Sequence, residues 1–239
     1  MKRLLIPFLL TVWFALSLRA SEEPLPSYRQ AYVILIQGAI SGSETMTEQV
    51  APDGNVLTSS AHEILVTDGI ETKRMAFTTA MTLRKGTWTP ISYSCRYSSG
   101  EARDSYEVAV SGAQVVRILN RSGKPHEARI QLQPGFVIVD FNVYYQYDYL
   151  LRRYDLKKGG RQTFTSFLPL IAADIPIALT RLEDSSLGSG EKALRAYNFR
   201  VEFGSSWVGT VCSDKNGRLI RLLIRDRGLE VVRKDLVPE

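Results

Sequence analysis

Glycine-centred turns divide this chain into short segments, most of which alternate apolar and polar residues. Glycine tolerates a positive φ, so a residue–glycine pair between two apolar runs is a typical signal of a β-hairpin turn. The pairs are Asp53-Gly54, Asp68-Gly69, Lys85-Gly86, Ser99-Gly100, Ser111-Gly112, Ser122-Gly123, Asn216-Gly217 and Arg227-Gly228. The first six recur every 11 to 17 residues, a spacing that fits strand, turn, strand. The sequence therefore predicts a large antiparallel meander.

The alternation indicates strands that bury one face and expose the other to water. It is clearest in residues 194–203, where the two alternating sets are Tyr197, Phe199, Val201, Phe203 and Asn198, Arg200, Glu202. Predicted strands cover residues 29–40, 44–50, 56–67, 71–83, 89–98, 105–110, 115–120, 127–132, 162–168, 177–183, 194–203, 206–213, 219–225 and 229–234. We expect a mainly β fold, a curved half-barrel or open barrel, in one domain over residues 29–239.

One segment interrupts the strand pattern. Residues 142–154 read as a helix, with Asn142 as its N-cap and Gly159-Gly160 as its stop. The residues that share one helical face are Tyr144, Tyr147, Leu151 and Tyr154. The prediction is a single interposed helix that packs its aromatic face on the sheet.

The N-terminus has the pattern of a secretory signal. Lys2 and Arg3 precede an apolar run from Leu4 to Leu18, and Ala20 is the expected cleavage point. An uncleaved membrane anchor is the alternative, but a run of 15 residues is short of the roughly 20 that a spanning helix needs. We expect a signal peptide at 1–20, a leader at 21–28, no stable transmembrane segment after cleavage, and a periplasmic or extracellular location.

The net charge argues against a nucleic-acid partner. The chain has 30 basic and 25 acidic residues, but without residues 1–20 the basic residues number 27. The basic excess of the whole chain therefore partly reflects the export signal. The rest of the sequence also has no long basic run.

The two cysteines, Cys95 and Cys212, stand in no zinc-type spacing. An oxidising compartment would permit a disulfide between them, and the sequence leaves this open because geometry decides.

No catalytic motif is found in the sequence. The two histidines, His62 and His126, have no partners in a metal-ligand or triad pattern, so neither a metal nor a cofactor is expected. The chain also lacks a nucleophile elbow, a P-loop, a dinucleotide fingerprint and an EF-hand loop. Carboxylate pairs near predicted turns leave open a hydrolase without a recognisable motif.

Two local features suit a ligand. Gly160 allows close approach of the backbone, Arg161 could hold a carboxylate or phosphate, and Gln162 could fix a polar headgroup. Tyr144 and Tyr147 belong to a tyrosine cluster of the kind found at cavity mouths. Both features also suit plain structural roles: a helix stop before a strand, and a helix packed on a sheet.

The tyrosine-rich segment 144–154, the run Gly159-Gly160-Arg161-Gln162 and the closing run 214–219 resemble a class of uncharacterised exported bacterial proteins. That class is similar to the lipoprotein-localisation carriers, whose fold is an antiparallel half-barrel wrapped over helices. The resemblance implies a hydrophobic concavity able to hold an acyl chain and identifies no catalytic residue. The chain departs from the carriers in having one predicted helix where they have several.

Three functions follow from these patterns. The first is an exported, non-catalytic binding or carrier module with an apolar cavity for a lipid or another hydrophobic small molecule. The second is a structural or interaction protein of the cell envelope, which needs no cavity and predicts an open sheet edge or apolar patch covered by another chain. The third is the hydrolase.

Overall fold

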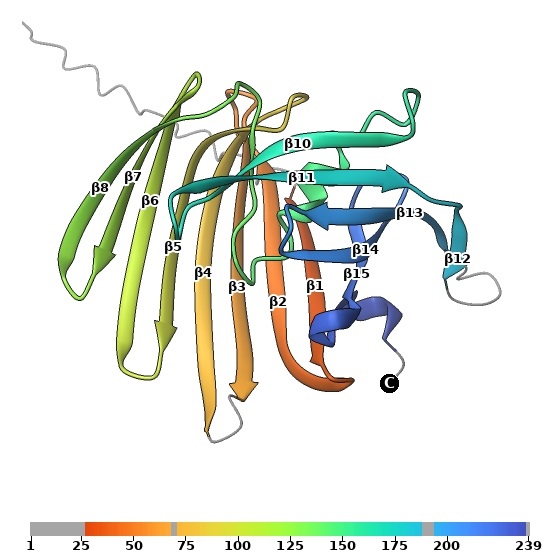
Figure 1. Ribbon diagram of the computed structural model, residues 1–239, viewed down its shortest axis with the longest axis horizontal. Coiled ribbons are helices and arrows are strands. Elements are labelled where there is room, and N and C mark those ends of the chain that lie inside the picture. Colours follow the sequence, from red (N-terminus) through yellow and green to blue (C-terminus); the bar gives the residue numbers. More distant parts are fainter. Residues whose placement is uncertain (1–26, 68–70, 188–193, 238–239) are drawn as a thin grey trace, which may run out of the picture.

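The computed structural model describes residues 27–67, 71–187 and 194–237, and these form one long sheet that does not close into a barrel and is antiparallel except for the parallel pair of β9 and β10. The strand order is β8-β7-β6-β5-β4-β3-β2-β1-β16-β15-β14-β13-β11-β10-β9, with β12 paired to β13. Figure 1 shows β10, β11 and β13 running roughly at right angles to the long strands β3–β7. The predicted mainly β, half-open architecture is confirmed.

The strands are β1 (Ser27–Ile36), β2 (Ala39–Val50), β3 (Val56–Thr67), β4 (Thr72–Arg84), β5 (Thr89–Ser99), β6 (Ala102–Ser111), β7 (Gln114–Arg121), β8 (Lys124–Gln131), β9 (Val137–Ile138), β10 (Arg161–Leu168), β11 (Ala173–Arg181), β12 (Ser185–Leu187), β13 (Leu194–Phe203), β14 (Trp207–Ser213), β15 (Leu219–Ile224) and β16 (Leu229–Arg233). The helix α1 spans Tyr147–Leu151, and the described residues also contain the short 3₁₀ helices η2 (Arg225–Arg227) and η3 (Lys234–Leu236). Within the described residues, no helix has the length and hydropathy needed to cross a bilayer.

Glycines close the hairpins as expected. Gly54, Gly86, Gly112 and Gly123 all have φ between 62° and 84°, which a side chain would strain. The predicted strand 29–40 is wrong in one respect: Gln37 and Gly38, with φ of 52° and 79°, form a turn that separates β1 from β2. The predicted turn at Asp68-Gly69 lies outside the described residues.

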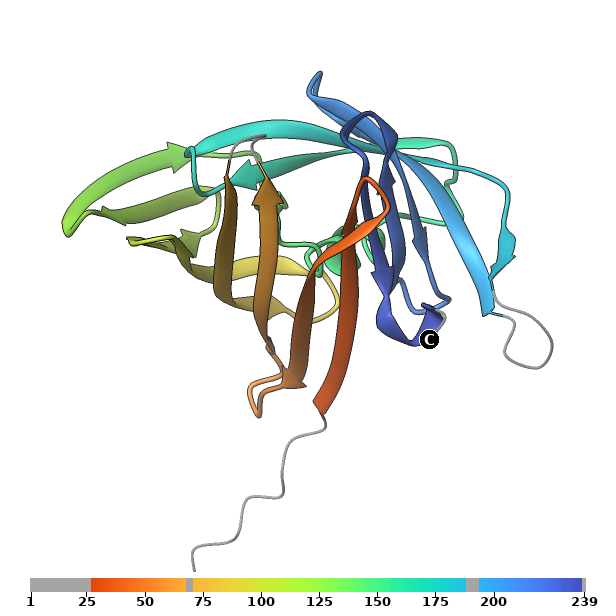
Figure 2. The same ribbon diagram turned by 90° about the horizontal axis from the view of Figure 1, so that it is seen from below.

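The concave face of the sheet is filled by the chain itself. The segment 136–154, which carries β9 and α1, lies between the two halves of the sheet (Figure 2). Its five tyrosines are each at most 5% exposed: Tyr144, Tyr145, Tyr147, Tyr149 and Tyr154. We call it the interior segment.

The helix predicted over 142–154 is wrong in extent. Asn142 has a φ of 59° and starts no helix, and only Tyr147–Leu151 are α-helical. Tyr145 and Tyr149, which the periodicity placed off the apolar face, are as buried as the others. The reason is that the sheet surrounds this segment, so contacts on all its sides determine its path and no single helical face does.

A buried carboxylate on β2 fastens the interior segment to the sheet. Glu44 is fully buried, and its Oε2 accepts the backbone N–H groups of Tyr144 and Tyr145, both at 3.0 Å. Burial raises the pKa of Glu44 to about 8, although those two hydrogen bonds oppose the shift. The folded protein therefore favours the protonated acid at neutral pH.

A second buried acid anchors the segment further along the sheet. Asp140 accepts hydrogen bonds from the hydroxyls of Tyr93 on β5 and Tyr106 on β6 at its Oδ2. Its backbone N–H donates to Gln146 Oε1 at 2.6 Å. Burial raises the pKa of Asp140, against the lowering effect of the two tyrosine hydrogen bonds.

The two cysteines lie in different clusters and both are free thiols, so the disulfide left open by the sequence is not formed. Cys95 belongs to the main core on the inner side of the sheet, beside Tyr106. Cys212 packs with Ala196 and Ile220 in a separate small cluster.

Glu44 makes stability depend on pH. Its folded pKa of about 8 lies above its ordinary value of 4.5, so the unfolded chain loses the proton first and the free energy of unfolding falls as pH rises toward 8. Burial raises the pKa of Asp148 to about 6 and lowers that of His62 to about 4. These two groups therefore change the free energy of unfolding mainly below pH 6.5. We therefore expect a loss of about 2 kcal/mol between pH 6.5 and 8, measured by urea unfolding.

Glu44→Gln keeps a hydrogen-bond acceptor for the two amides but cannot ionise, so it should remove most of that slope. Glu107→Gln on the exposed side of β6 is the control and should keep it. An unchanged slope in Glu44→Gln would contradict the assignment.

Candidate functional site

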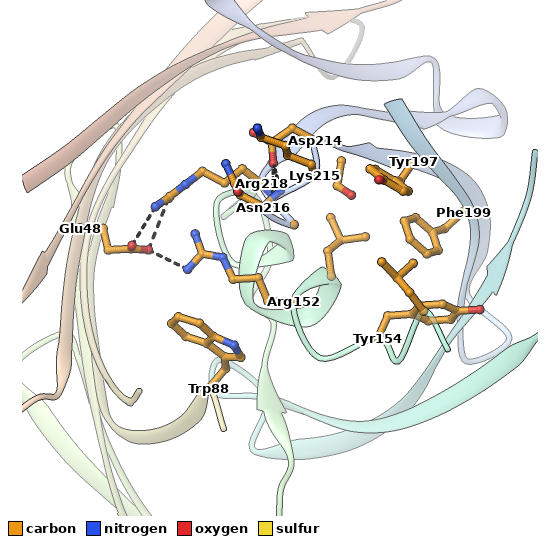
Figure 3. Close-up of a pocket in the computed structure, with 14 residues that line it drawn as sticks. Glu48, Trp88, Arg152, Tyr154, Tyr197, Phe199, Asp214, Lys215, Asn216 and Arg218 are labelled. Atoms are coloured by element: carbon orange, nitrogen blue, oxygen red, sulfur yellow. Dashed lines mark hydrogen bonds and ion pairs between the residues drawn. The ribbon is translucent and has the colours of Figure 1, made fainter. Parts of the chain in front are cut away.

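A pocket of about 470 Å³ opens where the end of α1 meets β2, β13 and the turn between β14 and β15. Figure 3 shows the charged side chains of Glu48, Arg152 and Arg218 on one side, and an aromatic group opposite. Trp88, from the turn between β4 and β5, lies below Arg152 in this view. The residues come from distant parts of the sequence and meet because the interior segment brings α1 against the sheet.

Glu48 is the centre of the charged side. Arg152 Nη1 donates to its Oε2 at 3.0 Å, and Arg218 Nη2 donates to its Oε1 at 2.8 Å. The Tyr149 hydroxyl donates a further hydrogen bond to Oε2 at 2.8 Å. Burial alone would raise the pKa of Glu48, but Arg152 and the hydrogen bonds from Arg218 and Tyr149 outweigh it, and the pKa is lowered. The carboxylate is thus ionised and shared by two guanidinium groups.

Asp148 lies behind this pair and is fully buried. Its Oδ2 is 3.9 Å from Arg152 Nη2 and 3.6 Å from Arg218 Nη1, and its Oδ1 accepts the backbone N–H of Leu219 at 2.8 Å. Burial raises the pKa of Asp148 to about 6, against the lowering effects of Arg152, the Leu219 N–H and Arg218. Two acids and two arginines therefore form one compact network.

Aromatic rings hold both guanidinium groups in place. Arg152 lies 4.7 Å from the centre of the Trp88 ring and 5.0 Å from that of Tyr149, and Arg218 lies 3.4 Å from that of Tyr28. Such contacts are stronger for buried groups, and the side chains of Arg152 and Arg218 are only 7% and 14% exposed. The arginines are rigid parts of the pocket wall.

The opposite wall is aromatic. Tyr154 meets Phe199 edge to face with ring centres 4.9 Å apart, and Arg181 packs 4.6 Å from the Tyr197 ring. Asp214, Lys215 and Asn216 from the β14–β15 turn also line the pocket.

Gly217 is required at the tip of the β14–β15 turn. It has a φ of 71°, and a Cβ there would come within 2.7 Å of Arg152 Cγ. The closing run 214–219, singled out in the sequence, thus contributes to the pocket through its turn.

The predicted site residues lie elsewhere. Tyr144 and Tyr147 are buried in the core, and the Gly160 carbonyl accepts the Tyr154 hydroxyl at 2.6 Å. Arg161 is exposed and pairs with Glu202 at 2.9 Å, while Gln162 is bonded to the Asp155 N–H and to two carbonyls of the loop before β10.

None of the five predicted residues lines the pocket, although Tyr154 of the same tyrosine cluster does. Among the described residues no group of His, Cys, Asp and Glu is placed to hold a metal ion.

No protein-family model matches the sequence, and no curated protein does. Among solved structures, a β-barrel-like protein of the domain of unknown function DUF1849 from Brucella abortus superposes with a TM-score of 0.60 at 8% identity, covering 88% of this chain and 95% of that chain. A DUF1089 family protein from Pseudomonas aeruginosa has a TM-score of 0.45 at 14% identity, covering 89% of this chain and 95% of that chain. The first likeness supports the β-barrel-like fold and carries no function. The resemblance to lipoprotein-localisation carriers stays a prediction.

Removing the carboxylate at the centre of the network should be costly. Glu48→Gln leaves two largely buried arginines without their shared charge, and we expect a loss of roughly 3 kcal/mol in the free energy of unfolding at pH 7. Glu202→Gln weakens two surface ion pairs, with Arg161 and Arg200, and should cost only a small fraction of that. Equal effects of the two substitutions in urea unfolding would show that the network is not a stabilising unit.

Proposed function

We propose that the protein is an exported, non-catalytic binding module that holds a small amphipathic ligand in the pocket beside α1. The observation that carries this proposal is the pairing of two differing walls: rigid arginines around Glu48, and the rings of Tyr154, Tyr197 and Phe199. The volume of about 470 Å³ lies in the range of small-molecule sites.

The lining indicates the chemistry of the ligand. Its charged residues are Glu48, Arg152, Asp214, Lys215 and Arg218, an excess of one positive charge. Within the described residues, Lys215 has no ion pair, whereas Arg152 and Arg218 are engaged with Glu48. A ligand with a flat or short apolar part and one carboxylate fits this lining, with the apolar part on Tyr197 and the carboxylate toward Lys215.

A long acyl chain fits less well. The interior segment occupies the concave face, where a lipid carrier would hold its cargo, and its tyrosines are buried there. An acyl chain longer than the pocket would have to displace that segment. The proposal therefore narrows the hydrophobic ligand expected from the sequence to a small one.

Trp88 provides the readout for the binding experiment. The other described tryptophan, Trp207, stacks on Phe203 with ring centres 5.3 Å apart, away from the pocket, and Trp207→Phe leaves Trp88 as the reporter. Short aliphatic and aromatic carboxylates should change its emission, and the matched alcohols should bind at least about tenfold more weakly. Lys215→Ala should abolish this preference, while Lys158→Ala, on the exposed loop before β10, should keep it.

Failure of every carboxylate and alcohol to affect Trp88 would contradict the proposal. Recovery of a long-chain lipid with the purified protein in native mass spectrometry would instead favour the carrier.

Export gives a separate prediction. Expression with the full N-terminus in a bacterium should yield a periplasmic protein whose intact mass lacks residues 1–20. Replacing Leu10 with Arg in the apolar run should leave the full-length chain in the cytoplasm. A periplasmic protein of full mass would favour the uncleaved anchor.

An interaction protein of the envelope is the second candidate. It is favoured by one observation: in the part of the chain that the structure describes, β8 lies at the end of the sheet with a strand on one side only.

A further inference from the structure

The free edge of the sheet at β8 has a backbone pattern that can be worked out residue by residue. Within the described residues β8 pairs with β7 alone, and Figure 1 shows it at one end of the sheet. Its other side presents backbone N–H and C=O groups to no strand. Such edges pair readily with another strand unless they are blocked.

The hairpin to β7 shows which residues point outward. Ser122 and Gly123, with φ of 51° and 75°, form a two-residue turn, and Arg121 is paired with Lys124. Beyond the other end of β8, the Leu132 N–H donates to the Ala113 carbonyl at 2.9 Å. Backbone groups alternate along an antiparallel strand, so the even-numbered residues of β8 face β7. The odd-numbered ones face outward: Pro125, Glu127, Arg129 and Gln131.

The side chains at this edge carry opposite charges. Glu127 and Arg129 lie on the outer face of the sheet, with Arg129 Nε 2.7 Å from Glu127 Oε1 and with side chains 48% and 77% exposed. They flank Ala128, which lies on the inner face. The three residues form a short stretch that is complementary to itself when reversed.

We propose that β8 pairs edge to edge with β8 of a second copy of this chain, antiparallel, with Ala128 opposite Ala128. In this register Glu127 lies opposite the second copy's Arg129, and the reverse holds across the two-fold axis. Both residues point their backbone groups outward, so each pair exchanges two N–H···O bonds, about four for the dimer. The sheets of two molecules then become continuous.

Charge selects this register over its neighbours. A shift by two residues one way places Glu127 opposite Glu127, and a shift the other way places Arg129 opposite Arg129. Like charges directly opposite are destabilising, whereas opposite charges contribute favourably. Pro125 has no N–H to donate and limits the contact to the part of β8 that follows it.

Charge reversal tests the register directly. Sedimentation of the exported chain at up to about 1 mM should show a monomer–dimer equilibrium that weakens as salt is added. Glu127→Arg and Arg129→Glu alone each place like charges opposite one another, and each should weaken dimerisation at least about tenfold. Equimolar mixing of the two variants pairs every charge with its opposite and should restore the dimer. Arg74→Glu, on the exposed face of β4, is the matched control and should dimerise as wild type.

A backbone variant tests the edge independently of charge. Arg129→Pro removes an outward N–H that β7 does not use, so the monomer should stay folded by circular dichroism while the dimer is lost. A wild-type chain that stays monomeric at every concentration overturns the proposal. A dimer that survives Glu127→Arg, Arg129→Glu and Arg129→Pro also overturns it, because its interface lies elsewhere. Capture of a strand from another protein by a monomeric chain would overturn it in favour of the envelope-interaction hypothesis.

Discussion

A curved sheet that does not close needs another segment to pack on its concave face. Here hydrogen bonds to buried carboxylates hold the interior segment in that position. Glu44 reaches from β2 to the backbone of the interior segment, whereas Asp140 and Asp148 reach from that segment to tyrosines and a backbone amide of the sheet. Apolar packing on a curved sheet is non-directional and would allow the segment to slide. The carboxylate hydrogen bonds give it one position, at the cost of burying acids whose pKa values are raised as a result.

The pocket depends on this anchoring. Asp148 and Arg152 are on neighbouring turns of the same short helical stretch, so fixing one of them to Leu219 places the other against Glu48 and Trp88. The charged wall is therefore assembled by tertiary structure and is as rigid as the core beneath it. Rigid walls reduce the ordering that a ligand must impose when it binds.

The fold could be predicted from the sequence because its signals are local. Glycine turns and two-residue alternation depend on neighbouring residues only, and the strands at 56–67 and 194–203 have the predicted bounds. The extent of α1 could not be predicted, since the tyrosine spacing at 144–154 is compatible with a helix while the surrounding sheet decides the path. The candidate site could not be predicted either: Glu48, Trp88 and Arg218 meet only after the interior segment has been placed. The predicted site residues Arg161 and Gln162 lie outside this pocket, where Arg161 pairs with Glu202 and Gln162 hydrogen-bonds the loop before β10.

The middle of the sheet is made by β1 and β16, two strands from nearly opposite ends of the chain. The hairpins from β1 to β8 join neighbouring strands and can form early, whereas the pairing of β1 with β16 requires nearly all of the intervening chain to be present. Contacts between such distant residues slow folding, because a long loop must close before they form. The pairing at the middle of the sheet is then the last to form. A chain truncated before β16 would keep the meander of β1 to β8 but lack the strand pairing that connects the two halves of the sheet.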